Sequence, residues 1–233
     1  MSFGVTEDLF GLGDTKWRPQ TGSKDPTAAG EAQVADSNGD IVASTVHGNA
    51  KAWSQSFKVV AGDSGTTVLL STKVKLGQLF SPVGDSALKA IVTKVDIATT
   101  NTAFPLVTVS TEQFFGDTSG NKTYTIPGVT ALKALKRAQG MGLVVAGVNR
   151  LNSCNLSASL QTVHEPDSLG VFVQSAGYAG RAESTGEAVN AAAAPAITAD
   201  SGWTAARTQS EATDNRDYGK GSLTVFKNIL PDS

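Results

Sequence analysis

The residues of this chain best suited to acid–base or metal chemistry are its two histidines, His47 and His164. His164 is next to Glu165 and close to Asp167, which makes it the centre of the best local cluster of titratable groups. A zinc site needs three or four ligands, but the chain has one cysteine and no His-x-x-x-His pair. We therefore interpret His164, Glu165 and Asp167 as turn residues that hydrogen-bond to one another.

Nucleophilic catalysis would need a serine or cysteine beside a histidine that an acid orients. The chain has neither a Gly-x-Ser-x-Gly motif nor a cysteine-protease signature around Cys154. Cys154 instead belongs to a segment of alternating residues, 153–163, and we predict that it is an inward-facing packing residue. A catalytic triad assembled from distant loops stays open, because separated residues leave no local pattern.

Two short segments resemble ligand-binding loops only in part. The glycine pairs at 11–13 and 140–142 are not followed by the Gly-Lys-Ser or Gly-Lys-Thr of a phosphate loop. The turn 36–40 has Asp, Asn and Asp at alternate positions, as calcium loops do, but lacks the glutamate expected seven residues further on. The sequence therefore predicts no catalytic residues, no cofactor and no metal, with calcium at 36–40 as a minor alternative.

Charge gives no indication of a nucleic-acid partner. Charged residues are 17% of the 233 residues and the net charge is -2, against about 25% charged residues in ordinary globular proteins. Lys133, Lys136 and Arg137 form the tightest group of cations, which we interpret as the solvated face of a short helix. We therefore expect no sequence-specific binding of nucleic acid.

The N-terminal residues Met1–Gly4 lack a basic segment followed by an apolar run, which a signal peptide would show. No stretch reaches the 18 or so apolar residues of a membrane helix. The expectation is a protein made in a host cytoplasm without a signal peptide and without membrane insertion.

Alternation of apolar and polar residues is the main structural signal. It predicts strands at 41–46, 53–59, 66–76, 87–98, 104–115, 122–126, 143–148, 153–163, 171–173 and 222–227. No helix of crossover length separates them, which favours antiparallel pairing. The predicted fold is mainly β, an antiparallel β-sandwich or barrel with one short flanking α-helix and long loops.

Three regions follow from this pattern. Residues 1–30 have no sustained period and are predicted to form an irregular N-terminal arm. Residues 31–180 form the β-sandwich core, with a short helix at about 130–139 that Thr130 caps and Gly140 ends. Residues 181–233 form a long loop rich in Ala, Thr and Ser, followed by a closing strand.

Large apolar residues in the two outer regions need cover, because exposed aromatic groups are adhesive. Either the chain's own core or a groove on a neighbouring copy could provide it. The candidate assembly contacts are Phe3, Leu9, Phe10, Trp17, Trp203 and Tyr218.

The order of these parts resembles that of tailed-bacteriophage virion structural proteins, and in particular tail tube proteins. The resemblance rests on the arm at 1–30, the alternating strand 153–163, the helix 130–139 and the closing strand 222–227. It implies a virion protein that assembles with copies of itself, and with other virion proteins, into stacked rings around a DNA channel. The chain departs from the family pattern because no long hairpin loop is recognisable.

Two other functions remain as alternatives. One is a capsid decoration or head-surface protein that binds through the arm. The other is a carbohydrate-binding β-sandwich module that uses Trp53, Trp203 or Tyr178 as stacking platforms.

Overall fold

The structure is a computed structural model of the whole chain. It describes residues 2–3, 7–28, 31–35, 41–46, 49–60, 67–84, 86–134, 136–146, 151–168, 171–190, 194–206, 210–213 and 219–232. For 2–3, 25–28, 31–35, 41–46, 49, 67–68 and 210–213 it describes the backbone alone.

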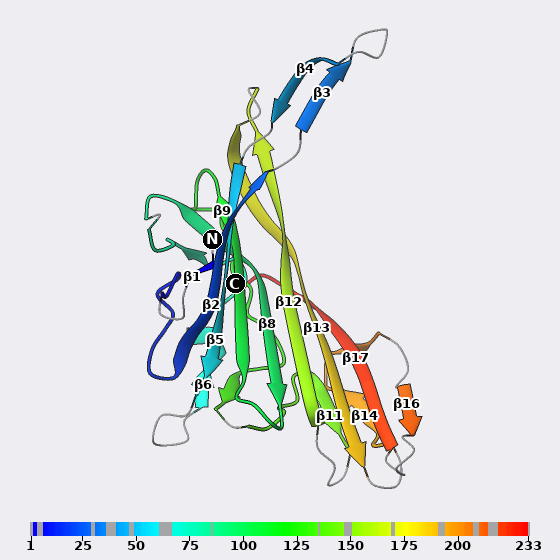
Figure 1. Cartoon of the computed structure of the whole chain (residues 1–233). Coiled ribbons are helices and arrows are strands. Elements are labelled where there is room, and N and C mark those ends of the chain that lie inside the picture. The colour runs from blue at the N-terminus through cyan, green and yellow to red at the C-terminus, as the bar shows by residue number, and fades with distance from the viewer. Residues whose placement is uncertain are drawn as a thin grey trace.

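Eleven strands form one large antiparallel sheet (Figure 1), which is open rather than closed into a barrel. In chain order its strands are β1 (Ser2–Phe3), β2 (Trp17–Ala28), β5 (Asn49–Val59), β7 (Leu79–Phe80), β8 (Lys89–Thr100), β9 (Leu106–Phe114), β12 (Leu151–Pro166), β13 (Phe172–Asn190), β15 (Thr204–Ala205), β16 (Ser210–Thr213) and β17 (Gly219–Ile229). The spatial order is β1-β2-β5-β9-β8-β12-β13-β17-β15, with β7 also on β8 and β16 also on β17. The predicted mainly β, antiparallel fold is confirmed.

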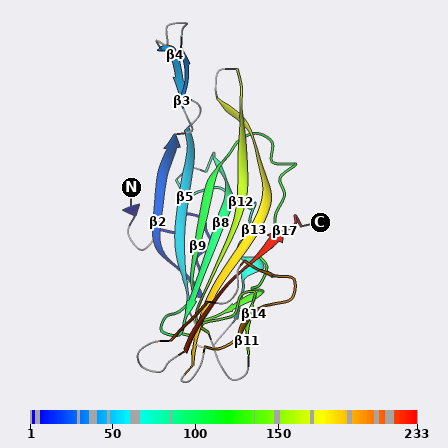
Figure 2. The same cartoon turned by 90° about the vertical axis from the view of Figure 1, so that its right-hand side faces the viewer.

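Three two-stranded sheets accompany the large one. They are β3 (Glu31–Ala35) with β4 (Ile41–Val46), β6 (Thr67–Leu69) with β10 (Ala131–Lys133), and β11 (Leu143–Val145) with β14 (Ile197–Ala199). A single turn of 3-10 helix, η1 (Leu70–Thr72), follows β6. The β3–β4 hairpin projects beyond the large sheet between β2 and β5 (Figures 1 and 2).

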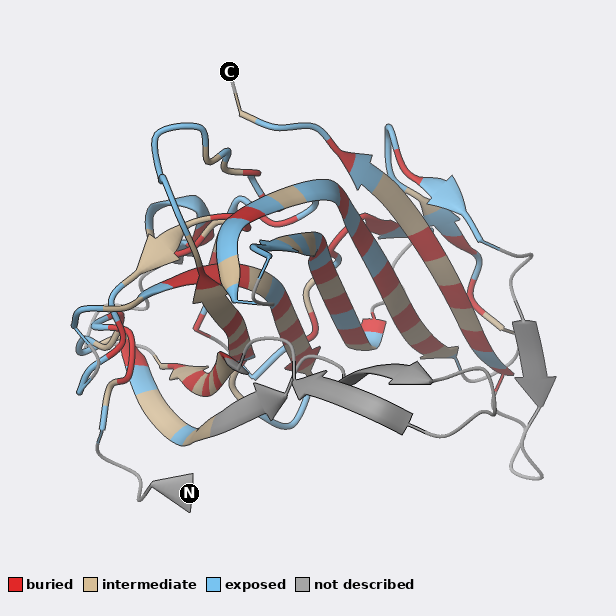
Figure 3. Cartoon of the chain, turned by 90° about the horizontal axis from the view of Figure 1, so that it is seen from above, coloured by how far each residue is buried: buried red, intermediate tan, exposed pale blue. Residues whose placement is uncertain are grey.

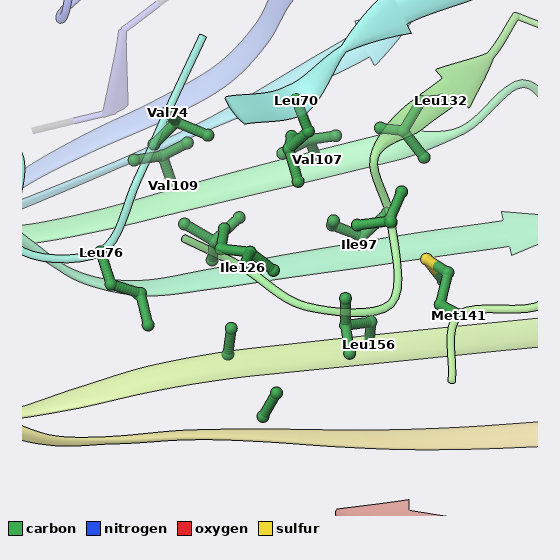
Figure 4. Packing of buried hydrophobic residues seen from close by; sticks show 14 of the residues in the cluster. Leu70, Val74, Leu76, Ile97, Val107, Val109, Ile126, Leu132, Met141 and Leu156 are labelled. Carbon is green, nitrogen blue, oxygen red and sulfur yellow. The ribbon is translucent and has the colours of Figure 1, made fainter. Parts of the chain in front are cut away.

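The core lies on one face of the large sheet. Figure 3 shows buried and exposed residues alternating along the long strands, as the period of two requires. Loops and small sheets from 67–84 and from 115–146, Leu135 aside, cover the buried face. In Figure 4 the side chains Leu70, Val74, Leu76, Ile126, Leu132 and Met141 of this layer meet Ile97, Val107, Val109 and Leu156 of the sheet. Each such side chain contributes about 1.5–3 kcal/mol when fully buried.

The helix predicted at about 130–139 is wrong. Ala131–Lys133 is strand β10, and the residues after it that the structure describes form an irregular loop. The main-chain N–H of Lys133 donates to Gln139 Oε1, and its carbonyl accepts from Gln139 Nε2, both at 2.9 Å. Because these hydrogen bonds replace the helical ones, Lys133 is the last residue of β10, and Lys136 and Arg137 lie on the loop after it and not on a helix face.

The irregular arm predicted at 1–30 is also corrected, because Trp17–Ala28 is a 12-residue strand of the large sheet. The loop before it is fastened to the core: Leu9 N–H donates to the buried Gln55 Oε1 at 2.8 Å. Asp8 accepts the N–H groups of Phe10 and Leu12. The strand was not predicted because its prolines and its glycine interrupt the alternation of apolar and polar residues. The pairing of β2 also has a register irregularity between Pro19 and Gly22.

The long loop predicted from residue 181 begins ten residues too early, since β13 continues to Asn190. Its core face consists of the small residues Ala182, Ser184, Gly186 and Ala188, all buried. A Cβ added at Gly186 would lie 2.6 Å from Leu143 Cδ1. The space in front of Gly186 is therefore filled by Leu143 of the covering layer. The strand was missed because its inward residues are not large. The predicted closing strand 222–227 is confirmed as part of β17.

Candidate assembly surface

The β12–β13 hairpin divides into two parts with different surroundings. From Ser153 to Ser159, β12 is paired on both edges, with β8 up to Lys94 and with β13. Beyond Ser159 it pairs with β13 alone, and β13 has no pairing with β17 before Gly180. We call residues 160–166 and 172–179 the distal hairpin. Among the described residues, both of its outer strand edges are without a β partner.

The hairpin leaves the sheet because two irregularities occur at this level. On β13, Ala179 and Gly180 together oppose Leu160, and Ala179 has a φ of 51°. Such a bulge bends a strand. On β8 the register shifts between Val92 and Lys94, and β7 pairs with the end of β8 from which β12 has departed. The distal hairpin therefore extends past the sheet at the same end as β3–β4 (Figure 2).

Apolar side chains are exposed on and next to the distal hairpin. Val163 is 44%, Val173 49% and Tyr178 48% exposed, and Val171, just before β13, is 55% exposed. Isolated exposed valines are ordinary on proteins. Here they coincide with unpaired main-chain edges, a combination that favours pairing with another chain.

A polar cluster holds the distal hairpin to β9. His164 Nδ1 lies 2.7 Å from Ser175 Oγ, its direct neighbour across the hairpin, and His164 Nε2 lies 3.1 Å from Glu112 Oε1. Thr162 Oγ1 donates to the other oxygen of Glu112 at 2.8 Å. Phe115 and Phe172 pack against the imidazole with ring centroids 5.5 Å and 5.0 Å away. The cluster thus joins β12, β13 and the end of β9.

The hydrogen bonds indicate which tautomer a neutral His164 imidazole adopts. A carboxylate only accepts, so the proton is on Nε2 and is donated to Glu112, while Nδ1 accepts the Ser175 hydroxyl. Ser175 Oγ in turn accepts the Phe115 N–H at 3.0 Å. The hydrogen bond from His164 lowers the pKa of Glu112 below its ordinary value, although burial opposes this, and Thr162 lowers it further.

The order serine, histidine, carboxylate is also that of a hydrolytic triad. Ser175 is only 4% exposed, however, and its oxygen is already occupied by a main-chain N–H. A substrate carbonyl has no approach to Oγ in this conformation. We therefore interpret the cluster as an anchor for the hairpin.

The cluster corrects the sequence-based grouping of His164 with Glu165 and Asp167. The partners of its ring are Glu112 and Ser175, and Asp167 instead accepts the Val171 N–H within the turn. Ser175 and Glu112 were missed because they are remote in sequence. One signal existed: His164 is in phase with the inward positions of the alternating segment 153–163.

The predicted assembly residues lie elsewhere. Leu9, Phe10, Trp17 and Trp203 are buried at 2%, 5%, 0% and 8% exposure, so this chain's own core covers them. This favours cover by the chain's own core over cover by a groove on a neighbouring copy. The Phe3 side chain and Tyr218 are outside the described residues.

Other sequence-based candidates are resolved in the same way. Cys154 is fully buried as predicted, and burial raises the pKa of its thiol. Trp53 is 2% exposed, so of the three proposed carbohydrate platforms only Tyr178 is at the surface. His47 and the possible calcium turn 36–40 are outside the described residues.

The described residues contain neither a membrane-spanning helix nor a group of metal ligands. No helix there is both long and apolar enough to cross a membrane. Nor do three or more His, Cys, Asp or Glu side chains come together there as metal ligands would. In comparisons with known proteins, no family model and no curated protein matches this chain.

Proposed function

We propose that this protein is a self-assembling structural protein of a virion and not an enzyme. More narrowly, we propose a tail tube subunit of a tailed bacteriophage, which forms stacked rings around a DNA channel with copies of itself and other virion proteins. It needs no cofactor for this role, and it is made in the host cytoplasm.

The observation that carries the proposal is the distal hairpin, whose two outer edges have no β partner among the described residues, although the Gly177 carbonyl accepts a hydrogen bond from the Tyr124 hydroxyl at 3.3 Å. Exposed N–H and C=O groups in a row are a template for another strand, and soluble monomers usually shield them. Here Val163 and Val173 add apolar contact beside those edges. A second copy would provide both the hydrogen bonds and the apolar cover. The long hairpin that seemed absent from the sequence is thus the feature that supports the resemblance best.

The sheet face away from the core is compatible with a channel wall. Some of its charges occur as opposite pairs, Lys94 with Asp96 at 2.9 Å and Lys220 with Glu187 at 2.9 Å. The other residues of its central strands are mostly small and polar, such as Ser157 and Thr108. A surface of mixed sign has a weak net field, so DNA would pass along it without being held.

The direct test is the assembly state of the purified chain, measured by sedimentation velocity and negative-stain electron microscopy. We expect rings or hollow tubes from the wild type. The double variant Val163→Lys with Val173→Lys should remain monomeric, because it places two charges beside the pairing edges. Val144→Lys is the matched control, since Val144 is 47% exposed on β11, away from the hairpin.

Other outcomes would redirect or end the proposal. A persistent monomer that binds only assembled capsids would favour a decoration protein. Retention of that monomer on glycan arrays, lost in Tyr178→Ala, would favour a carbohydrate-binding module. A monomer at high concentration that turns over a small molecule would reject a structural role altogether.

A further inference from the structure

The loop between β8 and β9 lies at the end of the molecule opposite the tip of the distal hairpin (Figures 1 and 2). Two pairs of cations surround features of this region, Lys58 with Lys136 at one aromatic ring and Lys133 with Arg137 at one hollow. The ring of Phe104 in that loop has Lys58 Nζ 5.9 Å and Lys136 Nζ 5.6 Å from its centroid. Arg137 lies on the same loop as Lys136, Lys133 is the last residue of β10 just before that loop, and both are exposed. The cations thus belong to β5, to the end of β10 and to the loop after it.

Hydrogen bonds hold the described residues on both sides of Lys136 and Arg137. Gln139 closes the loop by hydrogen-bonding to both main-chain groups of Lys133 at 2.9 Å. The Gln139 N–H donates to Thr99 Oγ1 at 3.1 Å, and the Ala138 N–H donates to Asn101 Oδ1 at 3.0 Å. These bonds attach the loop to the end of β8. Lys133 itself and the residues just after Arg137 are therefore attached to neighbouring main-chain and side-chain groups.

Among the described residues, no acidic side chain forms an ion pair with these four cations. Within the described part of the chain, Lys58, Lys133, Lys136 and Arg137 form no ion pair, whereas Lys73, Lys75, Lys94 and Lys220 each do. Next to the cations is a hollow of about 370 Å³, lined by Lys133, Arg137, Ala138, Gln139 and Gly140. Like charges that are held close together repel, so a bound anion would stabilise the arrangement.

We propose that this cationic loop binds phosphate groups of a polyanion, specifically the phosphodiester backbone of nucleic acid, without regard to sequence. Arg137 presents a planar fork that matches two phosphate oxygens, and the lysines act as point charges. A single strand has a phosphate charge about every 3.4 Å, a density that suits several cations within one loop. The site is separate from the hairpin edges, and the inference does not depend on the proposed function.

The test uses the full chain and a fluorescein-labelled oligothymidylate of about 20 nucleotides, with binding measured by fluorescence anisotropy over a range of salt. We expect wild-type binding that weakens with salt. The variant Lys133→Gln with Arg137→Gln should bind at least about tenfold more weakly at about 50 mM salt, and its log–log salt slope should fall by about 1.4. Its melting temperature should not change, because both side chains are exposed.

The matched control is Arg18→Gln with Lys122→Gln, two exposed cations outside the loop that also lack ion pairs. It should change affinity by less than about twofold. Equal losses in the two double variants, or no binding at low salt, would overturn the proposal. Competition identifies the ligand chemistry: polyphosphate should displace the oligonucleotide more effectively than polyglutamate of equal charge. The reverse order would assign the loop to an acidic protein partner instead.

Discussion

The proximal hairpin, 151–159 with 181–190, and the distal hairpin are halves of one antiparallel pair with one pattern of alternation. The proximal half has a strand on each side, and its inward residues Leu156 and Ala158 are buried in the core. The distal half has neither flanking strand, and its inward residues Thr162 and His164 reach a polar cluster on β9. The same secondary structure is thus held by apolar packing at one end and, beyond the buried Leu160, by hydrogen bonds and aromatic contacts at the other.

This difference means that the two halves should respond differently to change. Apolar burial is cooperative with the whole core, whereas a small anchored element can open locally. The distal hairpin should therefore open locally without loss of the fold.

The largest effect is expected in the proximal half. Leu156→Ala removes a side chain that is 1% exposed and leaves a cavity between the sheet and the covering layer. The free energy of unfolding should fall by about 2–5 kcal/mol. Urea denaturation followed by circular dichroism measures this, and a loss below about 1 kcal/mol would show that the two halves do not differ in packing.

Removal of the anchor should have a smaller and more local effect. His164→Ala breaks the bonds to Glu112 and Ser175 and should cost about 1–3 kcal/mol. Hydrogen exchange followed by mass spectrometry should show faster exchange in 160–179 and little change in 151–159. Glu165→Ala, on an exposed neighbour of the same strand, is the control. Uniformly faster exchange in both halves would mean that the hairpin opens as one unit.

The anchor should also weaken in acid. The pKa of Glu112 is lowered in the folded state below the ordinary value of 4.5. The stability that ionised Glu112 contributes is therefore complete above pH 4.5 and is lost as the pH falls through the pKa of the folded state. Thermal melting of wild type and Glu112→Gln should show the wild-type advantage at about pH 6 and its disappearance towards about pH 3. An advantage that persisted at low pH would contradict an ionised Glu112 in the cluster.

The smallest effect on stability is expected at the distal surface. Val163→Ala should change the free energy of unfolding by no more than about 0.5 kcal/mol, because the side chain is 44% exposed. Its sedimentation coefficient should fall if copies meet at this surface. A stability loss comparable with that of Leu156→Ala would place Val163 in the core and remove it from the candidate assembly surface.

Local patterns were sufficient for part of this architecture. Alternation in 153–163 predicted a strand with Cys154 inward, and it also placed His164 in phase with the core side. It did not reveal that the strand extends from Leu151 to Pro166. The helix at 130–139 failed for a related reason, because hydrogen bonds from Gln139 and Thr99 hold that segment in another conformation. Helical propensity is weak enough for such contacts to override it.

The sequence by itself determined that the chain is an antiparallel β protein, since period-two alternation does not require knowledge of which strands are neighbours. Only the tertiary structure decided which edges stay open, why Leu9 and Trp17 are interior, and that Glu112 and Ser175 join His164. These features depend on strand order and register, which bring together residues such as Glu112 and His164, 52 positions apart. Local preferences act over a few residues, and so they do not specify contacts at that separation.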